Sequence, residues 1–132
     1  MPFSNILIID DDTDDIEFLT DALRDCGVAD VNSVLNAMEA FHFLEKNKGR
    51  RSSPKLIITD LNLPGISGAE FIVRLKSKPL FKHIPVIILS TSIPDKEMDQ
   101  FREMGVVGFL KKPDTYNAYL EMAKFIKDRV AA

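Results

Sequence analysis

Acidic, hydroxyl and amine side chains stand where four apolar segments of this chain end: Asp10 and Asp11, Asp60, Ser90, and Lys112. An ionised carboxylate is unstable inside a buried strand, so Asp60 is expected just past a strand end, facing a loop. The carboxyl ends of parallel strands share one edge of a sheet, which is where ligand sites form. Acids near an amine at such an edge indicate a divalent cation together with a phosphoryl group.

The acidic residues near the N-terminus are unusually dense, although the whole chain has a net charge of only -3. The dense group comprises Asp10, Asp11, Asp12, Asp14, Asp15 and Glu17. Such a local cluster indicates a cation site rather than an acidic tail. The small net charge gives no electrostatic argument for binding to nucleic acid or to an anionic membrane, and neither is an expected partner.

Length and composition are those of a single globular domain, which we expect to span residues 1–132. The chain has 132 residues, of which 45% are apolar. Its one cysteine, Cys26, excludes an internal disulfide and indicates a reducing compartment. No apolar run reaches the ~18 residues that a membrane span needs, and the N-terminus lacks a signal-peptide pattern. We therefore predict a cytoplasmic protein.

Strand-like and helix-like segments alternate along the whole sequence. The predicted strands are 6–9, 30–35, 56–59, 86–89 and 106–110, and each is followed by a segment with helical spacing of apolar residues. Nearly continuous apolar strands indicate a parallel sheet that is buried on both faces. The predicted fold class is therefore α/β, a doubly wound sheet between two layers of helices.

The first helix begins within the acidic cluster. Thr13 and Asp12 are its candidate N-caps, because short polar side chains accept hydrogen bonds from the first free backbone N–H groups. Asp14 and Asp15 are interpreted as first-turn charges that complement the helix dipole. Near the C-terminus, the spacing of Tyr116 and later apolar residues predicts the last helix.

Four motifs occur in the order found in a known family: Ile8-Ile9-Asp10-Asp11-Asp12, Asp60-Leu61-Asn62-Leu63-Pro64 with Gly68 following, Ser90-Thr91, and Lys112-Pro113. Together they resemble the response regulator receiver domain (CheY-like superfamily) of two-component signalling, in its stand-alone single-domain form. The resemblance covers essentially the whole chain. It implies the flavodoxin-like (βα)5 fold, with five parallel strands in the order 2-1-3-4-5.

The resemblance also implies a phosphoryl-transfer site. In the family one aspartate accepts a phosphoryl group in a Mg2+-dependent reaction, and Asp60 occupies that position here. Asp11 corresponds to a direct metal ligand, and Asp10 to an acid that binds the metal through a water. Asn62 is expected to offer its backbone carbonyl to the metal.

Three further residues correspond to the family's charge and switch positions. Lys112 is expected to pair with the acceptor carboxylate and then with a phosphoryl oxygen. Ser90 corresponds to the switch hydroxyl that binds the phosphoryl group. Phe109, three residues before the lysine, stands where many receivers have tyrosine, so the packing part of the switch is retained without the tyrosine hydroxyl.

The expected phosphoryl donor is a sensor histidine kinase or a histidine phosphotransfer protein, docking near the first helix. A downstream protein target is expected on the face of the fourth helix, fifth strand and fifth helix, and a homodimer is possible. The domain is expected to catalyse its own phosphorylation and dephosphorylation, without turnover of an external substrate. Two alternatives stay open: a receiver-like adaptor that binds partners regardless of phosphorylation, and a phosphatase acting on external substrates.

Overall fold

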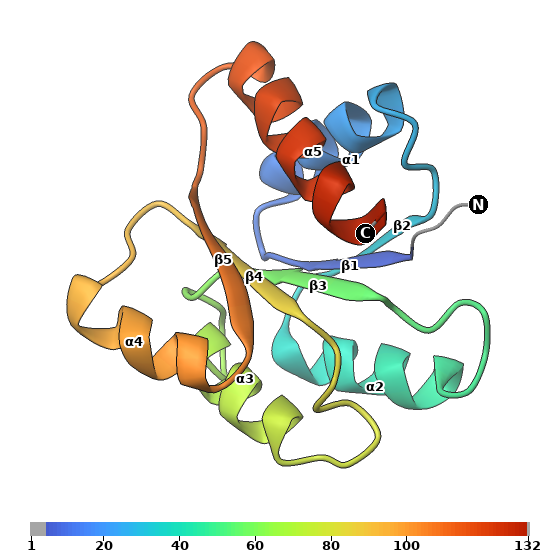
Figure 1. Cartoon of the computed structure of the whole chain (residues 1–132), viewed down its shortest axis with the longest axis vertical. Helices are drawn as coiled ribbons and strands as arrows, with labels where there is room; N and C mark the ends of the chain where they lie inside the picture. The colour runs from blue at the N-terminus through green and yellow to red at the C-terminus, as the bar shows by residue number, and fades with distance from the viewer. Residues whose placement is uncertain (1–4, 132) are drawn as a thin grey trace.

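The computed structural model describes residues 5–131 and contains five strands and five helices in strict alternation (Figure 1). In chain order the elements are β1 Ile6–Ile9, α1 Thr13–Asp25, β2 Val31–Val34, α2 Ala37–Asn47, β3 Leu56–Thr59, α3 Gly68–Lys76, β4 Val86–Ser90, α4 Asp95–Glu103, β5 Val106–Lys111 and α5 Tyr116–Ala131. The predicted strands are confirmed, with ends that differ by one residue at most, and the α/β class is confirmed.

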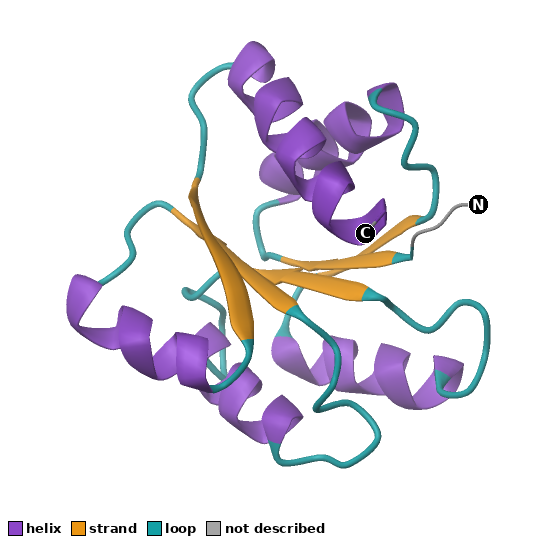
Figure 2. Cartoon of the chain, in the orientation of Figure 1, coloured by secondary structure: helices purple, strands orange, loops and turns teal. Residues whose placement is uncertain are grey.

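All the described strands, drawn as orange arrows in Figure 2, are parallel, and their order is β2-β1-β3-β4-β5 (labelled in Figure 1), as the family resemblance implied. Strands β1 and β3 are neighbours in full register, from Ile6 opposite Leu56 to Ile9 opposite Thr59. This register places the residues that follow the two strands, Asp10 and Asp60, side by side. The order β2-β1-β3 reverses the direction of chain winding at β1 and β3, where ligand sites lie in open α/β sheets.

Two layers of helices cover the sheet, α1 and α5 on one face and α2, α3 and α4 on the other (Figure 1). Alternate residues of each central strand enter different cores. On β1, Ile6 and Ile8 pack with α1 and α5, whereas Leu7 and Ile9 pack with the opposite layer. Both faces of the central strands are thus buried, which explains why their sequences are continuously apolar rather than alternating.

Side-chain caps fix where the helices near the strand ends begin. Asp12, not Thr13, is the N-cap of α1, and its Oδ1 accepts hydrogen bonds from the N–H groups of Asp14 and Asp15 at 2.9 and 3.2 Å. Thr13 is already the first helical residue. Ser67 caps α3 through the Glu70 N–H, as its sequence pattern predicts. These caps lock the loops that carry Asp10 and Asp60.

Among residues 5–131, no helix combines the length and apolarity of a membrane span.

Candidate functional site

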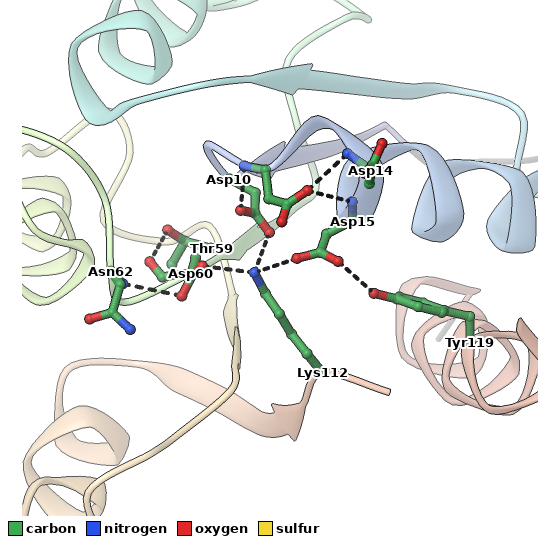
Figure 3. A network of polar contacts seen from close by, with 9 residues as sticks. Asp10, Asp14, Asp15, Thr59, Asp60, Asn62, Lys112 and Tyr119 are labelled. Carbon is green, nitrogen blue, oxygen red and sulfur yellow. Dashed lines mark hydrogen bonds and ion pairs between the residues drawn. The ribbon is translucent and has the colours of Figure 1, made fainter. Parts of the chain in front are cut away.

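The carboxyl ends of β1, β3 and β5 bring Asp10, Asp60 and Lys112 into direct contact (Figure 3). The Lys112 Nζ lies 2.9 Å from Asp10 Oδ2 and 2.9 Å from Asp60 Oδ2. All three side chains are at least nine-tenths buried. Lys111, one residue earlier, is exposed, because successive side chains of a strand point to opposite sides. The polar side chains at four strand ends were predicted to converge. Those that follow β1, β3 and β5 do so through direct bonds.

Asp15 is a member of this ion-pair group that the sequence interpretation assigned only to the helix dipole. Its Oδ2 lies 2.8 Å from Lys112 Nζ, and its Oδ1 accepts a hydrogen bond from the Tyr119 hydroxyl at 3.3 Å. A signal for this contact exists in the sequence, because Asp15 shares a helix face with Leu19 and Ala22, both fully buried. An acid on the buried face of a helix requires a partner.

Three carboxylates form a cluster that is able to hold a cation. Oxygen atoms of Asp10, Asp11 and Asp60 all lie within 4.8 Å of one another; Asp10 and Asp60 are buried and Asp11 is exposed. Such an all-oxygen set facing solvent on one side suits a hard divalent ion that keeps some of its waters, as Mg2+ does. These residues are among those to which the family resemblance assigned the metal site, with Asp11 as a direct ligand, Asp10 acting through a bound water and Asp60 as the acceptor, and these individual roles stay predictions. The metal role of the Asn62 carbonyl stays a prediction.

Backbone N–H groups orient the two buried acids. The Asp12 N–H donates to Asp10 Oδ1 at 3.0 Å, and the Asn62 N–H donates to Asp60 Oδ1 at 3.1 Å. Each acid therefore has one oxygen held by its own loop and the other bonded to Lys112. This division presents the carboxylates in a fixed direction before any ligand arrives.

The loop after Asp60 is held by the close approach of Gly68, the first residue of α3. A Cβ at this position would lie 2.1 Å from the Asp60 carbonyl oxygen and 2.7 Å from the Leu61 Cα. The Gly68 N–H donates to the Leu61 carbonyl at 2.9 Å. Only glycine allows this approach, so the glycine that follows Pro64 in the motif has a packing role beside the site.

Burial and hydrogen bonding shift the pKa values of two members of the group, Asp10 and Lys112. Burial raises the pKa of the Asp10 carboxyl above its ordinary value, although the Asp12 N–H and the Lys112 ammonium act in the opposite direction. Burial lowers the pKa of Lys112, but its hydrogen bonds to Asp15, Asp10 and Asp60 outweigh that effect and raise the pKa well above the ordinary lysine value. Lys112 is therefore a fixed positive charge at neutral pH.

Ser90 ends β4 at the same edge of the sheet but makes no bond to the ion-pair group. Its side chain is fully buried, and its Oγ has no hydrogen-bond partner among the described residues. A buried hydroxyl without a partner is uncommon and costs free energy, which marks the position as one kept for a reason other than stability.

Phe109 lies on β5 beside α4. Its ring centroid is 6.3 Å from that of Phe101, and the Arg102 guanidinium carbon lies 5.2 Å from its centroid. The side chain is half-buried against the core of the α2, α3 and α4 layer. The predicted switch residues Ser90 and Phe109 thus lie on adjacent strands, but no direct bond joins them.

Comparison with known proteins identifies the class to which this fold and site correspond. The family model described as "Response regulator receiver domain" matches residues 6–124. The chain therefore belongs to the response regulator receiver family, and its function is that of a receiver in two-component signalling.

Curated relatives and solved structures agree with that assignment. The chain is 32% identical to the two-component response regulator ARR6 of Arabidopsis thaliana, with 83% of this chain and 61% of the relative covered. It is 28% identical to the chemotaxis protein CheY1 of Helicobacter pylori, with 83% and 86% covered. Among solved structures, the phosphorylated cyanobacterial phytochrome response regulator RcpA has a TM-score of 0.85 and 30% identity over 99% of this chain and 96% of its own.

A second solved structure bears on the metal. The Mn2+-bound form of the response regulator Rcp1 has a TM-score of 0.76 and 27% identity, covering 96% of this chain and 93% of its own. A relative with the same fold therefore holds a divalent cation.

Proposed function

We propose that Asp60 accepts a phosphoryl group from a phosphohistidine of a sensor histidine kinase or a histidine phosphotransfer protein, in a Mg2+-dependent reaction. The observation that carries this proposal is the direct bond between the Lys112 ammonium and Asp60 within the acidic cluster of Asp10, Asp11 and Asp60. A nucleophilic carboxylate, a cation site and a fixed positive charge are the components that phosphoryl transfer requires.

Each residue then has a defined task. An Asp60 carboxylate oxygen attacks phosphorus, a P–O bond forms, and the P–N bond to the histidine breaks as the imidazole leaves. Lys112 neutralises charge on one phosphoryl oxygen, and the Ser90 hydroxyl is free to donate to another because its Oγ has no hydrogen-bond partner among residues 5–131. Asp10, Asp11 and Asp60 would hold Mg2+, which would supply positive charge to neutralise the clustered carboxylates and the phosphoryl oxygens.

The signalling output follows from Ser90 and Phe109. A phosphoryl group on Asp60 brings charge and three acceptor oxygens within the neighbourhood of Ser90. Movement of Ser90 toward it opens space beside β4, and the half-buried ring of Phe109 is the adjacent group able to fill that space. The surface formed by α4, β5 and α5 is then the face that a protein target, or a second copy of the chain, reads.

Intact mass after incubation with Mg2+ and acetyl phosphate tests the proposal. The wild-type protein is expected to gain one phosphoryl group, whereas Asp60→Asn and wild type in excess EDTA gain none. Asn keeps the size and one oxygen of the acid but is not a nucleophile. An adduct that survives in Asp60→Asn would move the acceptor elsewhere.

Absence of any wild-type adduct would instead favour a receiver-like adaptor that acts without phosphorylation. Release of multiple phosphates per protein from a small phosphoester would indicate a phosphatase. A calorimetric titration with Mg2+ separates these outcomes further, because Asp11→Asn should weaken metal binding, whereas Asp12→Asn, which retains an N-cap oxygen, should not.

A further inference from the structure

The Asp15 carboxylate connects three elements that are distant in sequence. One oxygen bonds to Lys112 after β5, and the other bonds to the Tyr119 hydroxyl on α5, while Asp15 itself lies in the first turn of α1 (Figure 3). The Asp15 side chain is 23% exposed and Tyr119 only 3% exposed. The contact is therefore formed largely away from solvent, where a charged hydrogen bond retains its strength.

Asp15 differs from the other two acids that bond to Lys112. An ammonium group has three protons, and the three carboxylates of Asp10, Asp15 and Asp60 each lie within 2.9 Å of Nζ. Asp10 and Asp60 are also members of the candidate cation cluster, and Asp60 is the proposed nucleophile. Asp15 alone among the three is not required to bind a cation or a phosphoryl group.

A lysine at a reaction centre needs such an independent partner. Its ammonium is a point charge on a flexible stem, so its position is not fixed by the side chain itself. When Asp10 and Asp60 turn toward other ligands, the ammonium loses two of its three acceptors. Asp15 keeps the third, and Tyr119 holds Asp15 in the orientation that this bond requires.

We propose that Asp15, oriented by Tyr119, is a positioning residue that holds the Lys112 ammonium beside Asp60 during phosphoryl transfer. This inference rests on the proposed function of Asp60 and Lys112. The Tyr119 ring packs on Phe18 of α1 with centroids 5.7 Å apart, so the packing of α1 on α5 fixes the tyrosine hydroxyl. The position of the Lys112 ammonium therefore depends on how α1 and α5 pack against each other.

The rate of phosphorylation by saturating acetyl phosphate and Mg2+ tests the proposal in Asp15→Asn. We expect the maximal rate to fall about tenfold, equivalent to about 1.4 kcal/mol, with little change in the acetyl phosphate concentration that gives half the maximal rate. Tyr119→Phe is expected to show a smaller decrease of the same kind, because the carboxylate remains but is less well oriented. Asp15→Glu, which restores a carboxylate, should recover part of the loss.

Asp14→Asn is the matched control. Asp14 lies in the same first turn and carries the same charge, but it is exposed and makes no ion pair with Lys112. If Asp15 only complemented the helix dipole, both substitutions would lower stability to urea equally and neither would change the rate. A wild-type rate in Asp15→Asn would overturn the proposal, and so would a faster rate, which would show that Asp15 withholds Lys112.

A second measurement shows whether the Lys112 ammonium is held in place, and it needs no phosphorylation. In protein labelled with 15N-lysine, an ammonium held by carboxylates exchanges its protons slowly and gives a resolved NMR signal, which Lys112→Met assigns. The signal should persist in Asp14→Asn with Mg2+ present and broaden or vanish in Asp15→Asn. Persistence in Asp15→Asn would overturn the positioning role, whereas an unphosphorylated wild type with the expected NMR result would overturn only the proposed function.

Discussion

The two helical layers contact the candidate site in different ways. The layer of α1 and α5 reaches it through polar bonds, since Asp15 and Tyr119 extend the ion-pair group of Lys112 into that layer. The layer of α2, α3 and α4 reaches it through packing, with Gly68 against the Asp60 loop and Phe109 against Phe101. Charged hydrogen bonds from the layer of α1 and α5 and close packing from the layer of α2, α3 and α4 therefore hold the same edge of the sheet.

This difference separates two properties of a receiver. Charged hydrogen bonds fix where the reacting groups lie, and their strength depends on protonation and burial. Packed aromatic and glycine contacts instead respond to displacement, because close-packed interfaces shift between discrete arrangements. We infer that Asp15 and Tyr119 of the α1 and α5 layer position the groups that react at Asp60, and that packing in the opposite layer transmits the change toward the surface of α4, β5 and α5.

The largest expected effect comes from removing the Lys112 ammonium, which joins the layer of α1 and α5 (the polar layer) to the site. Lys112→Met should lower the free energy of unfolding by about 3–5 kcal/mol, because it leaves buried carboxylates without a counter-charge. It should also slow phosphorylation by acetyl phosphate at least about 100-fold, the effect of losing one preorganised charged donor. Urea unfolding and intact-mass kinetics measure the two quantities.

Lys111→Met is the control for that prediction, because Lys111 is the exposed neighbour on the same strand. It should change the free energy of unfolding by no more than about 0.5 kcal/mol. Equal effects of the two substitutions would show that the ion-pair group contributes no more than general surface charge. Added Mg2+ should recover part of the stability lost in Lys112→Met, since a cation can replace the missing charge.

Ser90→Ala sharpens the comparison between the layers, because it should change stability and function in opposite directions. Removing a buried hydroxyl that has no hydrogen-bond partner in the described part of the chain should raise the free energy of unfolding by about 1 kcal/mol. The same change should slow phosphorylation, since a donor to the phosphoryl group is lost. The exposed Ser92 provides a control in Ser92→Ala, which should alter neither quantity. A loss of stability in Ser90→Ala would mean that Oγ has a partner in solution.

How far the sequence predicts the site can be seen from particular residues. Asp10, Asp60 and Lys112 follow apolar strands, and parallel strands end at one edge, so their convergence was predictable from local pattern alone. Asp15 was not identified, because its role depends on the rotation of α1 about its axis relative to the sheet. The chain gives this rotation only through the buried positions Leu19 and Ala22, which helical spacing links to Asp15.

Tyr119 shows the same limit on α5. The spacing argument used Tyr116 and not Tyr119 to mark the last helix, but Tyr116 is exposed and donates to Asp25, whereas Tyr119 is buried. The two tyrosines are three residues apart and lie on neighbouring parts of one helix surface. Both tyrosines bond to acids of α1, and which of them is buried depends on tertiary packing. That the Ser90 hydroxyl has no hydrogen-bond partner among the described residues was likewise not predictable, because it depends on every group around the hydroxyl.

The smallest expected effect concerns how the free energy of unfolding depends on pH above about 10, through Tyr119 of the α1 and α5 layer. Burial, together with the nearby Asp15 carboxylate, raises the pKa of Tyr119 from 10.0 to about 12. Between these values the unfolded chain releases the tyrosine proton and the folded protein keeps it, so the free energy of unfolding should fall as pH rises through this window. The limiting slope is about 1.4 kcal/mol per pH unit for one proton. Lys112, whose folded pKa is also raised, acts in the same direction.

Urea unfolding at pH 9, 10 and 11 measures this dependence in wild type, Tyr119→Phe and Tyr116→Phe. Tyr119→Phe should have a shallower decline than wild type, because one of the retained protons is gone. Tyr116→Phe should stay closer to wild type, since Tyr116 is exposed and solvent screens its bond to Asp25. If the two variants declined equally, the bond between Asp15 and Tyr119 would be no stronger than a surface contact. The layer of α1 and α5 would then act on the site only through the ion pair between Asp15 and Lys112, without a contribution from Tyr119.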